Sequence, residues 1–412
     1  MNMINFEEEQ LKEIVKKVIV RYGIGVDASI TISKGSDKVD GYLGEIVRIF
    51  VKDGNNTLNL IVKIGLKDEK LRANFPYSEA ISNEILAYEK ILPSFLNLQI
   101  EAKFPTLFNP FAKFYSASSA LNQEYLILED LKVSKFEMLE MKELLDHDHT
   151  KLICETYGKL HGLSFALKTL KKENFMGLDS ELHEVVNLIF TIYNIGKEFS
   201  KMWKYIQTVM REKGIECKRI NNYVDNSFSM MKDMSDIREE KFTCLLHGDC
   251  WTNNLMFKHK NYDGQKKVED IKLIDWQACR IGPPVFDISY TLYSGASKDV
   301  FSNLKMYLNI YYENLSKTLA LFDLDANSVY PFEEMKRQWK KYYHYGTILA
   351  APIWKFRSFG ENQGVDPLNY TSDDDSSFLH AISDAECDKD YLSERIKELM
   401  HHLDEIDGGK LD

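Results

Sequence analysis

The sequence predicts an α+β protein of two lobes: a small β-sheet lobe with one long helix, then a larger and mostly helical lobe. Strand patterns, in which branched apolar residues alternate with polar ones, are concentrated before residue 132. Apolar residues at helical spacing dominate from about residue 133 onward. A chain of 412 residues is also too long for one core. We therefore place the lobes at residues 1–132 and 133–412.

Composition narrows the class of partner. The chain carries 52 basic and 63 acidic residues, a net charge of −11, which argues against nucleic acid or an anionic membrane as the main partner. Its first segment has acids where a signal peptide has bases, and no apolar run reaches the length of a membrane span. The six cysteines show neither a CxxC pair nor zinc spacing. We expect a cytoplasmic protein with no membrane insertion and no obligate protein partner.

The first lobe begins with the pattern of an amphipathic helix in its first twenty residues, followed by the patterns of four strands and one long helix. Residues 28–35 and 44–65 predict three strands, the last two joined at the Asp-Gly turn in "KDGNN". Residues 77–92 have the apolar spacing of a helix, and we expect Pro93 just after its end. "EYLILEDL", residues 124–131, predicts a strand that leads into the second lobe.

The helical pattern of the second lobe is interrupted at residues 243–288. We expect two short apolar strands there, each with an aspartate near its end, joined by the polar turn "KHKNYDGQKKVED". The first strand leads into "HGDCWTNN", which holds Asp249 and Asn254, and the second, "IKLIDWQACRIGPP", holds Asp275. This arrangement predicts that the three side chains surround one point.

These residue types suit phosphoryl transfer from ATP. One carboxylate must take the proton of the acceptor hydroxyl, while an asparagine and a second carboxylate hold Mg²⁺, which prefers a few hard oxygen ligands. Kinases carry these groups as His-x-Asp-x-x-x-x-Asn followed by a second aspartate. Here His247, Asp249 and Asn254 have that spacing, and Asp275 follows. A lone His-Gly-Asp is more often just a turn, so the prediction depends on the whole set.

A kinase also needs a strand lysine paired with a helix glutamate. Lys63 lies in the apolar strand "LIVKIG", and Glu84 lies on the following helix, with Glu79 a weaker candidate nearer the helix start. A lone strand lysine is usually a surface residue, but these pieces occur in the right order across more than 200 residues. Three glycines are available to cover the phosphates, although "GSDKVDGYLG" does not follow GxGxxG: Gly35, Gly41 and Gly44.

Several segments resemble the ecdysteroid kinase-like family, a branch of the choline kinase and aminoglycoside phosphotransferase superfamily. They are "YLILEDL", "ETYGKLHGLSFALK", "HGDCWTNNLMF" and "LIDWQACRIGPPVFDISYTLY", and the resemblance extends from about Gly35 to Tyr293. His-Gly-Asp in place of His-Arg-Asp, and the missing activation segment, indicate a small-molecule kinase. The resemblance implies a two-lobed protein-kinase-like fold with the active site between the lobes.

The resemblance also implies a site that uses ATP and Mg²⁺ as cofactors. The implied residues are Asp249 as base, Lys63 and Glu84 at the phosphates, Asn254 and Asp275 as Mg²⁺ ligands, the backbone of Glu129 and Leu131 at the adenine, and His247 and Asp287 as supports.

The acceptor is the least defined part of the prediction. Trp251 and Trp276 flank the catalytic polar groups, and they either pack in the core or line an acceptor pocket. The aromatic clusters "MWKYI" and "KYYHYGTILAAPIW" leave the same choice open. We expect a small-molecule alcohol, a lipophilic metabolite such as an ecdysteroid or another steroid. The alternatives are a choline- or aminoglycoside-type phosphotransferase, favoured by the acidic balance and by cation–π attraction, and an inactive protein that binds a lipophilic hormone.

Overall fold

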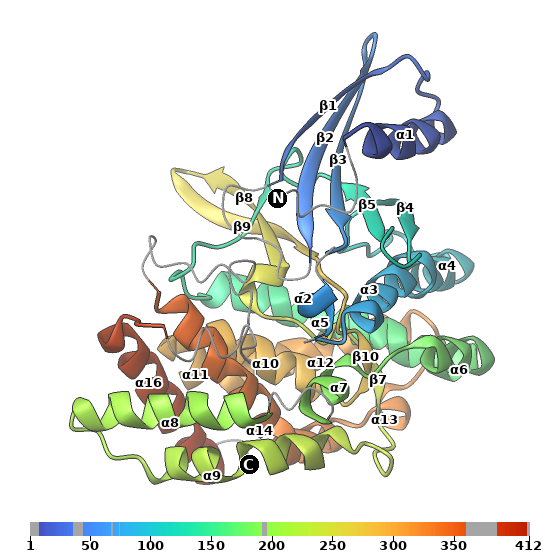
Figure 1. The fold of residues 1–412 in the computed structure, drawn as a ribbon. Helices are drawn as coiled ribbons and strands as arrows, with labels where there is room; N and C mark the ends of the chain where they lie inside the picture. The colour runs from blue at the N-terminus through green and yellow to red at the C-terminus, as the bar shows by residue number, and fades with distance from the viewer. Residues whose placement is uncertain are drawn as a thin grey trace.

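The computed structural model describes residues 8–35, 44–66, 69–73, 75–191, 196–359 and 385–409. An antiparallel sheet with its helices forms one end of the molecule, and a larger helical region with two small sheets forms the other (Figure 1). The predicted fold class is therefore confirmed, whereas the lobe boundary at residue 132 stays a prediction. Gly41 and the acidic run at 371–378, for which we expect a solvated loop, lie outside the described residues. No helix within the described ranges is long and apolar enough to cross a membrane.

The first lobe is built on five antiparallel strands in the order β1-β2-β3-β5-β4. Their bounds are β1 Ser29–Lys34, β2 Glu45–Asp53, β3 Asn56–Ile64, β4 Phe114–Ser118 and β5 Tyr125–Glu129. Helix α1 (Glu8–Ile19), followed by the short 3₁₀ helix η1 (Val20–Tyr22), buries its apolar side against one face of this sheet. Because side chains alternate along a strand, Val62 and Ile64 point into that core and Lys63 points to the opposite face.

The long helix of this lobe runs further than expected. After the short α2 (Glu69–Ala73) the chain forms α3 (Tyr77–Leu86), a π-helical turn η2 (Ala87–Ile91) and α4 (Leu92–Glu101) without a break. The expectation that the helix ends before Pro93 is wrong. The π turn resets the hydrogen-bond pattern, so Pro93 falls in the first turn of α4, where its missing N–H has little cost.

The second lobe is assembled around two pairs of helices. Helix α5 (His147–Leu170) packs along α12 (Leu304–Ala320), and α10 (Val285–Gly295) packs along α14 (Phe332–Arg357). The other described helices are α6 Lys172–Glu181, α7 Val185–Thr191, α8 Gly196–Glu212, α9 Lys218–Ser235, α11 Lys298–Ser302, α13 Ala326–Val329 and α16 Lys389–Asp407.

The strands of this lobe differ from the prediction. β7 (Cys244–Leu246) pairs with β10 (Arg280–Gly282), and a separate hairpin of β8 (Leu255–Tyr262) and β9 (Gln265–Leu273) lies between them in sequence, flanked by the short β6 (Phe136–Glu137). Most of the segment expected as a polar turn is therefore strand. The turn itself is Asp263-Gly264, both at positive φ. The outer part of this hairpin is solvent-exposed, so its polar composition resembled a loop.

The aromatic clusters of the second lobe belong to its core. Trp203, Tyr342, Tyr345 and Trp354 are each at most 1% exposed. Tyr345 stacks on Phe286 with 4.1 Å between ring centroids. The sequence left open whether these residues pack in the core or line an acceptor pocket, and their burial shows that they pack helices together.

The contact between α5 and α12 generates a stability prediction. A Cβ at Gly158 would lie 2.4 Å from the Tyr311 carbonyl oxygen, so Gly158→Ala must push the two helices apart. We expect it to lower the free energy of unfolding by about 1–3 kcal/mol, measured by urea denaturation. Gly177→Ala on α6 is the control, because a Cβ there meets nothing within 4 Å and alanine favours helix by up to about 1 kcal/mol. Equal stability of the two variants would contradict the role of the close contact.

Candidate active site

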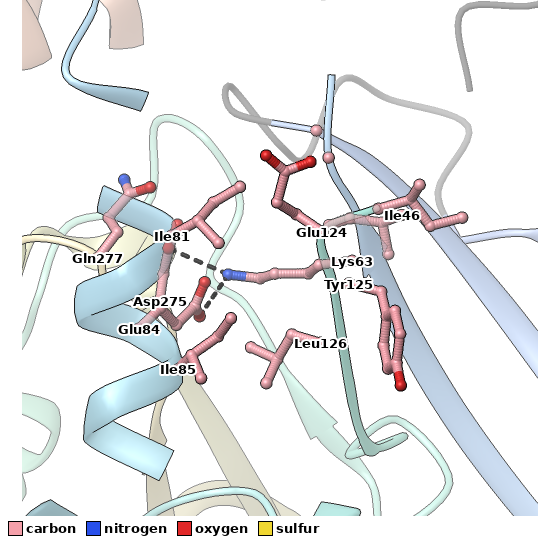
Figure 2. A pocket seen from close by; sticks show the side chains of 13 residues that line it. Ile46, Lys63, Ile81, Glu84, Ile85, Glu124, Tyr125, Leu126, Asp275 and Gln277 are labelled. Atoms are coloured by element: carbon pink, nitrogen blue, oxygen red, sulfur yellow. Dashed lines mark hydrogen bonds and ion pairs between the residues drawn. The ribbon is translucent and has the colours of Figure 1, made fainter. Parts of the chain in front are cut away.

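The site is organised around Lys63, which projects from the cleft-facing side of β3. Its Nζ lies 2.7 Å from Glu84 Oε1 on α3 and 3.0 Å from Asp275 Oδ1, in the loop that follows β9 (Figure 2). The three side chains therefore join a strand, a helix and a loop that are up to 212 residues apart. Glu84, which the sequence ranked above Glu79, is the helix carboxylate that contacts the lysine.

The charges of this group depend on one another. Burial lowers the pKa of Lys63, but the negative charges of Asp275 and Glu84 outweigh burial and hold that pKa above its ordinary value. Burial also raises the pKa of Glu84. Lys63 is consequently a permanent cation in the cleft, placed where it can neutralise anionic groups.

Asp249 and Asn254 form the second part of the site. They belong to the loop between β7 and β8, which contains the short 3₁₀ helix η3 (Thr252–Asn254). Asn254 Nδ2 donates to the backbone oxygen of Asp249 at 2.7 Å and to its Oδ2 at 2.9 Å. Because the amide nitrogen is used in this way, the Asn254 side-chain oxygen is the atom left to act as a ligand.

The Asp249 carboxylate sits in an environment suited to proton transfer. Tyr290 donates to its Oδ1 at 3.3 Å, and Gln277 Nε2 donates to its Oδ2 at 3.4 Å. Burial, and next the charge of Asp275, raise the pKa of Asp249 to about 7, although these hydrogen bonds oppose the rise. A carboxyl that titrates near neutral pH is close to the optimum for a general base.

Asp287 holds the start of the loop between β7 and β8, which we call the catalytic loop because it carries the predicted base Asp249. Its two carboxylate oxygens accept the backbone amides of His247 at 2.8 Å and Gly248 at 3.0 Å. His161 on α5 adds a third contact, with Nε2 3.2 Å from Oδ2. Burial raises the pKa of Asp287, but the hydrogen bond and charge of His161 outweigh it, so the pKa lies below its ordinary value. The carboxylate therefore remains charged and holds the loop.

His247 connects the two aspartate-bearing segments. Its Nε2 lies 2.9 Å from the carbonyl oxygen of Ile274, and its Nδ1 accepts the Asp249 amide at 3.3 Å. The ring therefore donates on one side and accepts on the other, as neutral imidazole does. Burial lowers the pKa of His247, which favours that neutral form.

Two backbone conformations explain the residue choice around the aspartates. Gly248 has φ 83°, and a Cβ there would lie 1.9 Å from the Ala278 carbonyl oxygen, so only glycine fits between His247 and Asp249. Asp275 has φ 67°, which is uncommon for a residue with a side chain. Strain of this kind is typical of functional sites, where the surrounding structure enforces it.

A cleft of about 1020 Å³ lies between the sheet and the catalytic loop. Its lining includes most of the residues that the sequence singled out: Gly35, Lys63, Glu129, Leu131, Asp249, Trp251, Asn254 and Asp275. A smaller adjoining pocket of about 560 Å³ contains Gly44 and, as Figure 2 shows, Glu84 and Gln277. Gly41, the third candidate glycine, is outside the described residues.

The two tryptophans occupy different environments. Trp251 lines the large cleft beside Asp249, with its ring edge against Phe356. Trp276 is only 2% exposed, packs against the His247 ring at 4.6 Å between centroids, and is not part of the cleft lining. The position of Trp276 favours core packing, whereas Trp251 is part of the cleft wall.

Three further residues belong to this site and were not predicted from the sequence: His161, Gln277 and Tyr290. Each carried a local signal. His161 is a histidine on the buried side of an otherwise apolar helix, Gln277 is two residues after Asp275, and Tyr290 is one helical turn after Asp287.

The oxygen donors of the cleft fit a magnesium ion bound together with phosphate. Asn254 and Asp275 supply hard oxygens, and Mg²⁺ keeps water or phosphate oxygens in its other positions. Within the described ranges, no group of three or more His, Cys, Asp or Glu side chains could hold a metal by itself.

The fold and the site together define a kinase-like protein of the small-molecule type. The profile of the ecdysteroid kinase-like family matches residues 38–324, more than half of the chain, and the chain belongs to this family. Among solved structures, the chain is similar to the spectinomycin phosphotransferase APH(9)-Ia in complex with ADP and spectinomycin. The identity is 12% and the TM-score 0.31, over 84% of this chain and 99% of that chain. No curated protein matches.

The raised pKa of Asp249 predicts a pH-dependent stability effect. Above pH 7 the folded state must hold Asp249 ionised against burial and against the Asp275 charge, a penalty that is absent in the unfolded chain. Asp249→Asn removes this penalty. We expect the variant to be more stable than the wild type at pH 8, by about 1 kcal/mol or more in urea denaturation.

The sign of the effect follows from protonation. As the pH falls from 7 towards 4, the folded wild type takes up a proton before the unfolded chain does, so the advantage of Asp249→Asn shrinks. Asp225→Asn, at an exposed site on α9, is the control and should show no such trend. An advantage that is independent of pH would mean that Asp249 does not titrate near neutrality.

Proposed function

We propose that this protein is a kinase that transfers the γ-phosphoryl group of ATP, with Mg²⁺, to a hydroxyl of a lipophilic small molecule. The observation that carries the proposal is the contact of Lys63 with both Glu84 and Asp275, on the same cleft that Asp249 and Asn254 line. A protein that only carried a hormone would need neither the lysine nor a pair of metal ligands.

Nucleotide binding is assigned to the cleft-facing side of the sheet, on β3 and the end of β5. The Lys63 ammonium, held in place by Glu84, would contact the phosphates. The adenine would meet the backbone of Glu129 and Leu131, which line the far end of the cleft. Within the described part of the chain, the Leu131 amide donates to no backbone oxygen, so it is available to a base nitrogen.

Asp249 is assigned as the catalytic base. Its carboxylate takes the proton of the acceptor hydroxyl while that oxygen forms a bond to the γ-phosphorus, and the bond from phosphorus to the bridging oxygen of ADP breaks. Tyr290 and Gln277 hold the carboxylate in one orientation. Asn254 and Asp275 would hold Mg²⁺, which neutralises charge on the phosphate oxygens.

The proposal of a lipophilic acceptor has less support than the reaction. The buried aromatic clusters of the second lobe no longer argue for an apolar pocket, because they pack in the core. The remaining support is local: Trp251, Met138 and Met256 line the cleft and offer apolar surface near Asp249. An ecdysteroid or other steroid alcohol is the acceptor class that we propose, in keeping with the family.

Two binding and turnover measurements test this function. We expect the purified protein to bind ATP more tightly with Mg²⁺ than without it, and to consume ATP with a hydroxylated steroid. The acceptor panel should also contain choline, ethanolamine, aminoglycosides and plant phenolics. Turnover on choline alone would overturn the lipophilic acceptor but not the kinase. Absence of ATP binding in both conditions would favour an inactive hormone-binding protein.

Two substitutions separate the roles of the aspartates. Asp249→Asn should lower kcat about 100-fold or more, because it removes the base, and should leave the affinity for the Mg²⁺ nucleotide nearly unchanged. Asp275→Ala should instead abolish the Mg²⁺ dependence of nucleotide binding. Asp225→Asn serves as the matched control with wild-type kinetics. Full turnover in Asp249→Asn would show that Asp249 is not the base.

A further inference from the structure

Arg357 is a buried cation at the end of α14 that contacts the catalytic loop. It is 1% exposed. Its Nη1 donates to Thr252 Oγ1 at 2.6 Å, and its Nη2 donates to the Glu143 carbonyl oxygen at 2.6 Å. Thr252 lies in η3, between Asp249 and Asn254. The guanidinium therefore joins the end of α14, the segment before α5 and the loop that carries the proposed base and metal ligand.

The hydrogen-bond partners of Arg357 within the described ranges are neutral groups. Across the described ranges no carboxylate forms an ion pair with it, and its Nε has no hydrogen-bond partner. Burial lowers the pKa of its guanidinium, yet arginine remains charged in proteins. The described partners of the guanidinium are the Thr252 hydroxyl, the Glu143 carbonyl oxygen and the face of the Trp354 ring, 5.2 Å from its centroid.

Thr252 is itself held in one orientation. It is 2% exposed, and a Cβ at Gly295 would lie 2.5 Å from its methyl carbon, so α10 packs closely against the methyl side. The hydroxyl is directed at Arg357. The residues just before Thr252 and Arg357 are also in contact. The rings of Trp251 and Phe356 pack edge to face, with 5.9 Å between centroids. Two successive residues of α14 thus contact two successive residues of the catalytic loop.

We infer that Arg357 is a positioning residue, which acts through Thr252 to hold Asp249 and Asn254 in their working geometry. The inference rests on the proposed function. Asp287 fixes the loop on the His247 side of Asp249, and Arg357 fixes it on the Asn254 side. The base is consequently held between two anchored points, which limits its motion towards and away from an acceptor hydroxyl.

The test combines two substitutions that break the same hydrogen bond. Thr252→Val keeps the shape of the side chain and removes its hydroxyl, and Arg357→Met keeps apolar volume and removes the fork of donors. Each should lower kcat about tenfold or more, while the affinity for ATP without Mg²⁺ stays within about twofold of the wild type. The double variant should be no slower than the slower single variant, because both act through one contact. Thr252→Ser should restore most of the turnover.

A second readout does not depend on catalysis. Amide hydrogen exchange of residues 250–254 should become faster in Thr252→Val and Arg357→Met. Arg219→Met is the control: Arg219 on α9 binds Asp404 and Asp407 on α16, away from the loop, so its loss should leave this exchange and kcat unchanged. If Arg357→Met does not fold, Thr252→Val carries the test.

The outcomes separate the inference from the proposed function. Wild-type kcat and unchanged exchange in the folded Thr252→Val variant would overturn the positioning role, as would a double variant whose loss of kcat is the product of the two single losses. If the wild type fails to consume ATP with every acceptor in the panel, the proposed reaction fails. The positioning role stands in that case if both substitutions still accelerate amide exchange of the loop.

Discussion

The Lys63 ammonium contacts two carboxylates, those of Glu84 and Asp275, and the geometry of the site depends on that contact. A lysine in a largely buried position needs an anion nearby. Glu84 and Asp275 would repel each other as carboxylates if the Lys63 ammonium did not lie between them. Asp249 also responds to this group, since the charge of Asp275 contributes to its raised pKa. The ion pairs of Lys63, in addition to packing, therefore fix the relative positions of β3, α3 and the loop after β9.

The two loops of the site, one between β7 and β8 and one after β9, adopt conformations that are unfavourable in isolation and are held in them by hydrogen bonds. Positive φ at Asp275 and the close approach at Gly248 both require outside support. That support comes from buried polar groups with fixed charge states: ionised Asp287, neutral His247 and cationic Arg357. Together they define the arrangement of side chains around the cleft.

The sequence predicted features that depend on residues close together in the chain. It did not predict features that depend on the three-dimensional arrangement of the chain. The spacing from His247 to Asn254 lies within one loop, and strand alternation alone puts Lys63 on the face opposite the core, so both could be read from the residues. The continuation of the helix past Pro93 could not, because it depends on a π turn that leaves no clear pattern in the sequence. The outer part of the β8–β9 hairpin was expected as a turn, since exposed strand segments lack apolar alternation.

The π turn after α3 changes the direction in which that helix presents its side chains. Eleven residues make slightly more than three full turns of a regular α-helix, so an unbroken helix would direct Glu84 to about the same side as Phe95, which packs in the core. The widened turn acts as a one-residue insertion and rotates the two halves by roughly a quarter turn relative to each other. One continuous helix can thereby face the cleft beside Lys63 with its first half and the helical core with its second. A helix of regular pitch would present both halves to the same surface, and the extra residue in the π turn removes that restriction.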